Sequence, residues 1–170
     1  TIDDGWRSTY EIAYPILRKY GYPATLFVYT DFVGGGANAL TWEMIAELSR
    51  NGVDIQGHTK THRNLSRRFR RESFNEYFDS LKKEISDSTR IIKKHLKKEV
   101  RYLAYPYGDT NHLVVALVAK AGYRGAFTVE RGGNPFFTPA YRVDRSIIYG
   151  SYDIQDFENN LVIASGKALH

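Results

Sequence analysis

Three short motifs contain the residue types that can do chemistry. Asp3 and Asp4 are adjacent carboxylates. His58 and His62 are imidazoles four residues apart, a spacing that lets both rings reach one metal ion when the chain makes a helical turn. Residues 105–108 form a turn sequence with aromatic flanks. Each motif alone also fits an ordinary turn or a pair of surface residues. Its position in the fold therefore has to decide between a structural and a functional role.

The elements around these motifs predict a parallel sheet. Short apolar segments alternate with helical ones, which is typical of βα units. Each motif follows a predicted strand, and the carboxyl ends of parallel strands meet at the rim where barrel enzymes carry catalytic residues. We therefore expect the three motifs to share one site. Strands are expected at residues 1–2, 24–29, 53–56, 101–105, 124–129 and 142–148, and helices at residues 8–20, 42–51, 71–97, 111–121 and 153–164.

A carboxylate and two imidazoles at one rim would supply three ligands to a metal ion. That number leaves a fourth position open for water, as catalytic zinc sites require. A bound metal can lower the pKa of water to about 7, so the second carboxylate would be free to act as a base near neutral pH. The donor set suits one divalent transition metal, whether zinc, cobalt, nickel or iron, and of these we expect zinc.

In order and spacing, the three motifs resemble the first three motifs of the polysaccharide deacetylases, carbohydrate esterase family 4. The resemblance covers about residues 1–130 and is closest to the branch that acts on poly-β-1,6-N-acetylglucosamine in biofilm matrices. It implies an α/β fold of the distorted (β/α) barrel type, incomplete at the ends. It also implies metal-dependent removal of N-acetyl groups from a polysaccharide. We expect one such domain over residues 1–170, with a truncated first strand.

Carried over by position, the resemblance assigns roles to individual residues. It implies that Asp3 is the general base and that the backbone N–H of Tyr107 donates to the oxyanion. Thr59 would stabilise the loop of the second motif. The implied metal ligands are Asp4, His58 and His62, and the expected substrate contacts are Trp6, Tyr105, Pro106, Arg142 and Arg145.

One departure from the family pattern concerns the support of the base. Ala104 stands where many members have an arginine that contacts the base carboxylate. Arg142 or Arg145, from the last predicted strand, could reach the same rim and replace it. The alternative is that both arginines only solvate the end of a strand.

A second departure concerns the acid that protonates the leaving amine. Family members commonly use a late histidine, and His170 is a weak match. His95 and His112 are expected on the surface of helices. In the biofilm-matrix branch the acid histidine precedes the Asp-Asp motif, so we expect a chain that starts at Thr1 to lack it.

Composition and charge exclude several other classes. With 170 residues the chain is about one domain long, and it has no cysteine for a disulfide framework or a thiol nucleophile. No apolar run approaches the roughly 20 residues of a transmembrane helix. The net charge is +5, but the basic excess lies in residues 63–98, which carry 12 lysines and arginines against 5 acidic residues. We expect no nucleic-acid partner, although an anionic surface could contact Arg67, Arg68, Arg70 and Arg71.

The main hypothesis is an N-deacetylase of a polymer that contains N-acetylglucosamine: poly-β-1,6-N-acetylglucosamine by preference, otherwise chitin or peptidoglycan. An O-acetyl esterase would use the same machinery on an ester. A different class is a glycan-binding module with impaired turnover, in which Trp6, Tyr105 and Tyr107 stack on sugars. A polymeric substrate implies a location outside the cell or in its envelope.

Overall fold

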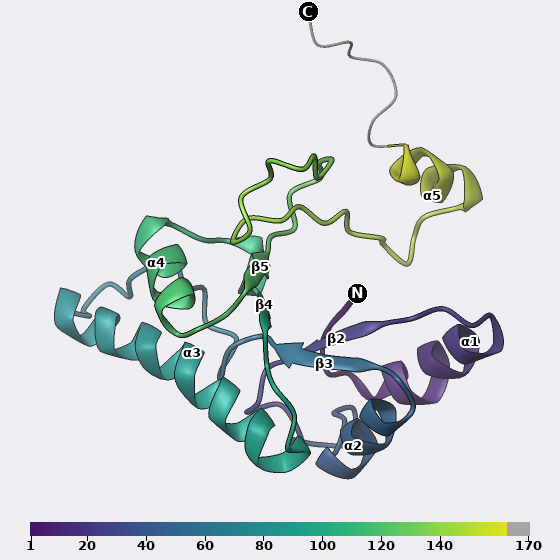
Figure 1. The fold of residues 1–170 in the computed structure, drawn as a ribbon, viewed down its shortest axis with the longest axis horizontal. Helices are drawn as coiled ribbons and strands as arrows, with labels where there is room; N and C mark the ends of the chain where they lie inside the picture. Colours follow the sequence, from purple (N-terminus) through teal and green to yellow (C-terminus); the bar gives the residue numbers. More distant parts are fainter. Residues whose placement is uncertain (163–170) are drawn as a thin grey trace, which may run out of the picture.

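The computed structural model describes residues 1–162, and its centre is a curled sheet of five parallel strands (Figure 1). The strands follow one another across the sheet in chain order, and each pairs in parallel with the next. This open sheet is an incomplete barrel in an α/β fold, as predicted. The strands are β1 (Ile2–Asp4), β2 (Thr25–Val28), β3 (Asp54–Gly57), β4 (Tyr102–Ala104) and β5 (Gly125–Phe127).

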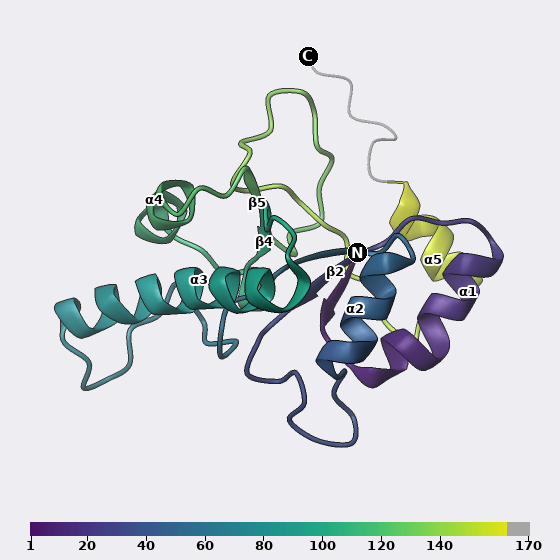
Figure 2. The ribbon, with the colours of Figure 1, turned by 60° about the horizontal axis from the view of Figure 1, so that its bottom comes forward.

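Helices connect the strands and cover the sheet (Figures 1 and 2). Helices α2 and α3 pack on β3, and α4 packs on α3. The buried side chains between these layers are aliphatic, among them Leu26, Leu48, Leu81 and Leu103. The helices are α1 (Tyr14–Lys19), preceded by a π-helical turn (Thr9–Ala13), α2 (Trp42–Arg50), α3 (Phe74–Leu96), α4 (His112–Lys120) and α5 (Ile154–Leu161).

Capping side chains set the beginnings of the helices that matter most for the site. The hydroxyl of Thr41 accepts from the amide of Met44 at the start of α2. Ser73 and Glu76 form a capping box at the start of α3. Helix α3 therefore begins at Phe74, after the loop that follows the second motif, and its length carries it across the sheet. No helix among residues 1–162 is both long enough and apolar enough to cross a membrane.

The buried face of α3 differs from the predicted one at its beginning. The spacing of apolar residues in this helix predicts Phe74 and Phe78 on the buried face, but Phe74 is exposed and Phe78 is only half-buried. Tyr77 is the first buried residue of this face instead. Its hydroxyl donates to the carbonyl of Leu65, which holds the ring toward the core. Glu84 is also buried on this face, at a position where the apolar pattern predicts no charge.

The predicted strand at residues 142–148 is wrong. Val143 makes a single parallel bridge to Phe127, and the segment then leaves the sheet. The reason lies at the next residue, Asp144, whose backbone N–H and C=O both bond to the side-chain amide of Asn134, at 2.9 Å each. An amide side chain that satisfies both groups replaces the neighbouring strand, so the ladder stops there.

Candidate metal centre and active site

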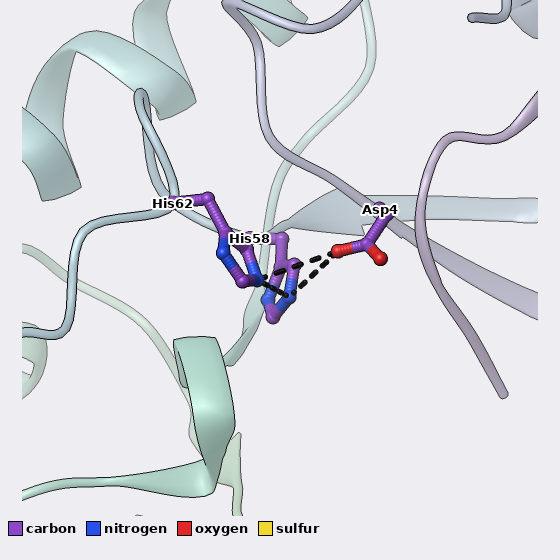
Figure 3. A group of neighbouring side chains, drawn as sticks. All are labelled: Asp4, His58 and His62. Atoms are coloured by element: carbon purple, nitrogen blue, oxygen red, sulfur yellow. Dashed lines mark hydrogen bonds and ion pairs between the residues drawn. The ribbon is translucent and has the colours of Figure 1, made fainter. Parts of the chain in front are cut away.

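Asp4, His58 and His62 converge at the carboxyl end of the sheet (Figure 3). Asp4 ends β1, and His58 directly follows β3. The Nε2 atoms of the two histidines lie 3.1 Å apart, and Oδ1 of Asp4 lies 3.5 Å from Nε2 of His58 and 3.4 Å from Nε2 of His62. One imidazole nitrogen from each ring and one carboxylate oxygen thus face a common point, which is the donor arrangement for a single metal ion.

A strand carbonyl fixes the ring of His58. Its Nδ1 lies 2.8 Å from the carbonyl oxygen of Ala104 at the end of β4, and the ring is buried. Because a carbonyl can only accept, Nδ1 carries the proton and Nε2 keeps its lone pair. That tautomer is the one a metal ligand needs, and a backbone carbonyl is a common partner for it.

Trp6 fixes the carboxylate of Asp4. The indole N–H of Trp6 donates to Oδ2 at 3.1 Å, which leaves Oδ1 to face the histidines. The pKa of Asp4 lies below its usual value, chiefly because of the neighbouring His58 ring and also because Trp6 donates a hydrogen bond to the carboxylate. The carboxylate is therefore held in the charged form that binds a cation.

The ring of His62 lies between Tyr29 and Tyr107, with ring centroids 5.0 Å and 4.8 Å away. Burial lowers the pKa of His62, and the neighbouring His58 lowers it further. Both effects favour the neutral ring. The backbone N–H of His62 donates to the hydroxyl of buried Thr59, so Thr59 stabilises this loop, as the resemblance implies.

Backbone strain is concentrated at the site. Five non-glycine residues among residues 1–162 have a positive φ angle, and four of them belong to the three motifs. A non-glycine residue in this region costs roughly 1–3 kcal/mol and persists only where surrounding contacts hold it, which is typical of functional sites. The four residues are Asp4, Thr59, His62 and Tyr107.

The two acidic residues of the first motif point to different partners. Asp3 receives a two-pronged ion pair from Arg145, with N–O distances of 2.7 Å and 2.8 Å. The guanidinium of Arg145 also donates to the carbonyl of Thr128 and lies 5.3 Å from the centre of the Phe27 ring. Arg145 therefore occupies the place we expected for one of the two arginines, although it comes from an irregular segment.

Arg142 does not reach the Asp3 carboxylate. Its guanidinium lies 3.9 Å from the carboxylate of Glu130, and the side chain is largely exposed. Of the two alternatives that the sequence left open for the base, the structure places only Arg145 beside Asp3.

The third motif has a buried half and an exposed half. Tyr105 is fully buried, and its hydroxyl donates to the carbonyl of Tyr141; burial raises the pKa of Tyr105 to about 12. Pro106 is buried as well. Neither residue has an exposed face beside the cluster, so the expected contact of these two residues with substrate stays a prediction that their burial does not favour. They are structural residues of the turn.

Tyr107 is the exposed residue of that turn, and its side chain is 62% accessible. The hydrogen bonds of the turn use the amides of Gly108 and Asp109, not the amide of Tyr107. At Gly108, φ is +71° and a Cβ would lie 2.4 Å from the side chain of Val129, so only glycine fits. The turn thus presents Tyr107 in one orientation beside His62.

A groove of about 460 Å³ adjoins Tyr107. Its far wall is the loop that follows His62, in which Phe69 is 63% exposed. Arg63 holds this loop in place through an ion pair with Glu72 and by packing 4.2 Å from the centre of the Phe69 ring. The groove is lined by Arg63, Asn64, Arg67, Phe69, Tyr107 and Asp109.

Two contacts near the candidate metal site were not predicted from the sequence. The carboxylate of Glu84 accepts hydrogen bonds from the loop between the two histidines. Its signal was present, since Glu84 interrupts an otherwise apolar helix face between Leu81 and Ile85. The bond from Trp6 to Asp4 had no such signal, because the sequence indicated only a tryptophan near the site.

The other histidines lie elsewhere. His95 stacks on Trp42 with a centroid distance of 4.1 Å, and His112 begins α4 with an exposed side chain. His170 lies outside the described residues. Residues 1–162 therefore place only His58 and His62 within the metal cluster.

A carboxylate and two imidazoles at the rim of a parallel sheet, with a second carboxylate beside them, define a site of the mononuclear metallohydrolase type. Residues 1–126 match the family described as polysaccharide deacetylase, and the chain belongs to this family. The metal cluster and the five-stranded half-barrel are thus those of a polysaccharide deacetylase domain.

Individual relatives agree with this assignment. The chain is 29% identical over 147 residues to poly-beta-1,6-N-acetyl-D-glucosamine N-deacetylase of Staphylococcus aureus. The matched region covers 81% of this chain and 51% of that protein. A deacetylase of Streptococcus pyogenes, PplD in complex with acetate, has the same fold, with a TM-score of 0.81, 27% identity and coverage of 93% and 67%. The chain spans about half the length of the curated relatives it matches.

Proposed function

We propose that this chain is the catalytic region of a metal-dependent N-deacetylase that acts on a polysaccharide containing N-acetylglucosamine. The observation that carries the proposal is the convergence of Asp4, His58 and His62 next to Asp3. A metal ion bound there, zinc by preference, would supply Lewis-acid activation of water and of the amide carbonyl. The tautomer of His58 and the free Oδ1 of Asp4 fit such an ion.

The residues around the cluster would do the remaining chemistry. Asp3 accepts a proton as water attacks the carbonyl carbon, and Arg145 holds its carboxylate in place. The backbone N–H of Tyr107 donates to the oxygen that becomes negatively charged. The C–N bond then breaks to give acetate and an amine, and the departing nitrogen would take up the proton that Asp3 received from water.

The polymer favoured as substrate is poly-β-1,6-N-acetylglucosamine, with chitin or peptidoglycan as alternatives. The support is the similarity to the Staphylococcus aureus enzyme of that name. Exposed aromatic rings of Trp6 and Tyr107 flank the metal cluster and can pack on sugar faces. Such a polymer places the protein outside the cell or in its envelope.

The loop after His62 offers a contact for an anionic surface or polymer. Phe69 and four arginines are exposed there. Contacts of this kind weaken as salt rises, so binding to a membrane or wall preparation that falls with added salt would support this role. The four arginines are Arg67, Arg68, Arg70 and Arg71.

Acetate release tests the proposed activity. We expect the zinc-loaded protein to release acetate from poly-β-1,6-N-acetylglucosamine oligomers faster than from acetylated xylan, an ester. Asp3→Asn should reduce turnover by about 10²- to 10⁴-fold, the usual share of a general base. Asp54→Asn, at the amino end of β3, is the matched control and should keep parental activity.

Three results would change this conclusion. Faster release from acetylated xylan would indicate an esterase. Glycan binding without acetate release, in a protein that holds one metal per chain, would indicate a binding module instead. Equal activity of the parent protein and Asp3→Asn would remove Asp3 from the role of base.

A further inference from the structure

Glu84 is a buried carboxylate on α3, far from the metal ligands in sequence but in contact with the loop between them. Its side chain is only 6% exposed. One oxygen accepts from the backbone amides of Lys60 and Thr61, at 3.0 Å and 2.8 Å, and the other accepts from the hydroxyl of Thr61 at 2.7 Å. All three donors lie between His58 and His62.

The loop needs such an anchor because its backbone is strained. Thr59 and His62 both have positive φ angles, at 71° and 64°, on either side of the two residues that Glu84 holds. Segments in this conformation relax unless surrounding contacts hold them. Relaxation would move His62, whereas His58 is fixed separately by the strand carbonyl of Ala104.

A second set of contacts holds the opposite side of the same loop. The amides of Thr30 and Asp31 donate to the carbonyls of Thr59 and Lys60, and the Lys60 ammonium pairs with Asp31 at 2.6 Å. The loop is thus clamped between the extension of β2 and helix α3. Only the α3 side of this clamp is a charged side chain in the core, and burial of a charge is costly unless it is paired or hydrogen-bonded.

We propose that Glu84 is a positioning residue for the metal centre: its carboxylate holds residues 60 and 61 so that His62 stays at ligand distance from His58 and Asp4. The proposal rests on the metal ligation in the proposed function. It assigns a share of the metal affinity to helix α3, which carries no ligand itself. A negative charge close to the site adds to the attraction for a cation.

Cobalt binding by purified protein tests this inference without an activity assay. We expect Glu84→Ala to weaken Co²⁺ binding by about 10- to 100-fold, the usual effect of losing a residue that orients a ligand. Glu84→Gln keeps the shape and one acceptor oxygen, so it should lose less. The visible absorption spectrum of bound Co²⁺ should change in both variants, because the position of His62 changes.

Two further variants separate positioning from folding. Ser88→Ala lies one turn along the same buried face and removes a hydroxyl that makes no hydrogen bond, so Co²⁺ affinity should stay parental. Thr61→Val removes a donor from the loop side without touching α3, and should weaken Co²⁺ binding severalfold. Combined with Glu84→Ala, its effect should be clearly less than additive, since both remove the same bond.

The outcomes are distinguishable. Parental Co²⁺ affinity in a folded Glu84→Ala and in Thr61→Val would overturn the inference while leaving the proposed function intact. Additive effects of the two substitutions would overturn it as well. A parent protein that binds no Co²⁺ would overturn both the inference and the metal-dependent mechanism.

Discussion

The two halves of the active site are built in different ways. The metal half consists of side chains at the ends of β1 and β3, two strands separated by β2, and a strand carbonyl and a helix carboxylate contact the histidines and their loop. The base half, named for the proposed role of Asp3 as general base, consists of Asp3 and its partner Arg145, which lies 142 residues away in the chain. That partner belongs to a segment that makes one bridge to the sheet.

This difference indicates that metal binding and turnover can be lost separately. Contacts within a regular sheet open only with the fold as a whole, whereas an irregular segment can open locally at lower cost. A few hydrogen bonds hold this segment against the rest of the molecule, such as those between the side chain of Asn134 and the backbone of Asp144. Local opening there would release Arg145 from Asp3 without disturbing the metal ligands.

The largest effect is expected from a substitution that removes a residue of the metal half. His62→Ala removes one of three ligands, so we expect bound metal after exhaustive dialysis to fall from about one per chain to nearly none. Acetate release should disappear with it. Elemental analysis of the parent protein and the variant measures the change, and circular dichroism checks that the variant is folded. Retention of metal at the parental ratio would show that His62 is not a ligand.

The second prediction concerns a substitution that alters the base half alone. Arg145→Ala removes the partner of Asp3, and we expect kcat to fall by about 10- to 100-fold, because a misplaced catalytic group loses its alignment. Metal content should stay parental. Arg145→Lys should recover only part of the loss, since an ammonium cannot form the two-pronged contact.

Arg142→Ala is the matched control for Arg145→Ala. It removes the same type of side chain three residues earlier in the chain, where the nearest carboxylate is that of Glu130. We expect parental kcat and parental metal content. If Arg142→Ala lowers kcat as much as Arg145→Ala does, the contact between Arg145 and Asp3 is not the cause.

The same division separates what the sequence could predict from what it could not. The five strands and the metal motifs depend on local patterns, namely apolar runs and the residues that directly follow them. The path of residues 142–148 was predicted wrongly because it depends on Asn134, whose side chain competes with a strand. The burial of Tyr105 depends in the same way on a carbonyl at Tyr141. Such contacts between distant segments leave no periodic signal.

Glu84 lies between these cases. Its position on an apolar helix face was visible in the sequence, but its partners were not, because they are backbone amides of a loop whose path only the fold defines. A buried carboxylate could equally have formed an ion pair within the core. Sequence patterns therefore located the three residues of the candidate metal site but not the residues that contact their loops.

The smallest effect is expected from a substitution in the loop after His62. It tests whether the rigid structure of the metal half extends into this loop. Arg63 and Glu72 close this loop with N–O distances of 2.9 Å, and hydrogen bonds from Arg63 lower the pKa of Glu72 to about 2. A lowered carboxyl pKa stabilises the folded state above the unfolded pKa, and that stability is lost as pH falls toward the folded value. We expect Glu72→Gln to cost on the order of 1–2 kcal/mol near neutral pH.

Urea unfolding at several pH values measures this contribution as the difference between the parent protein and Glu72→Gln. The difference should be constant above about pH 5 and should shrink as pH falls toward about 2, because Glu72 of the unfolded chain takes up a proton in this range while the ion pair keeps the folded form charged. Asp79→Asn breaks an exposed pair with Lys82 and should give a smaller difference at every pH. A pH-independent difference for Glu72→Gln would mean that Glu72 holds the loop by packing rather than by charge, and the rigidity of the metal half would then end at His62.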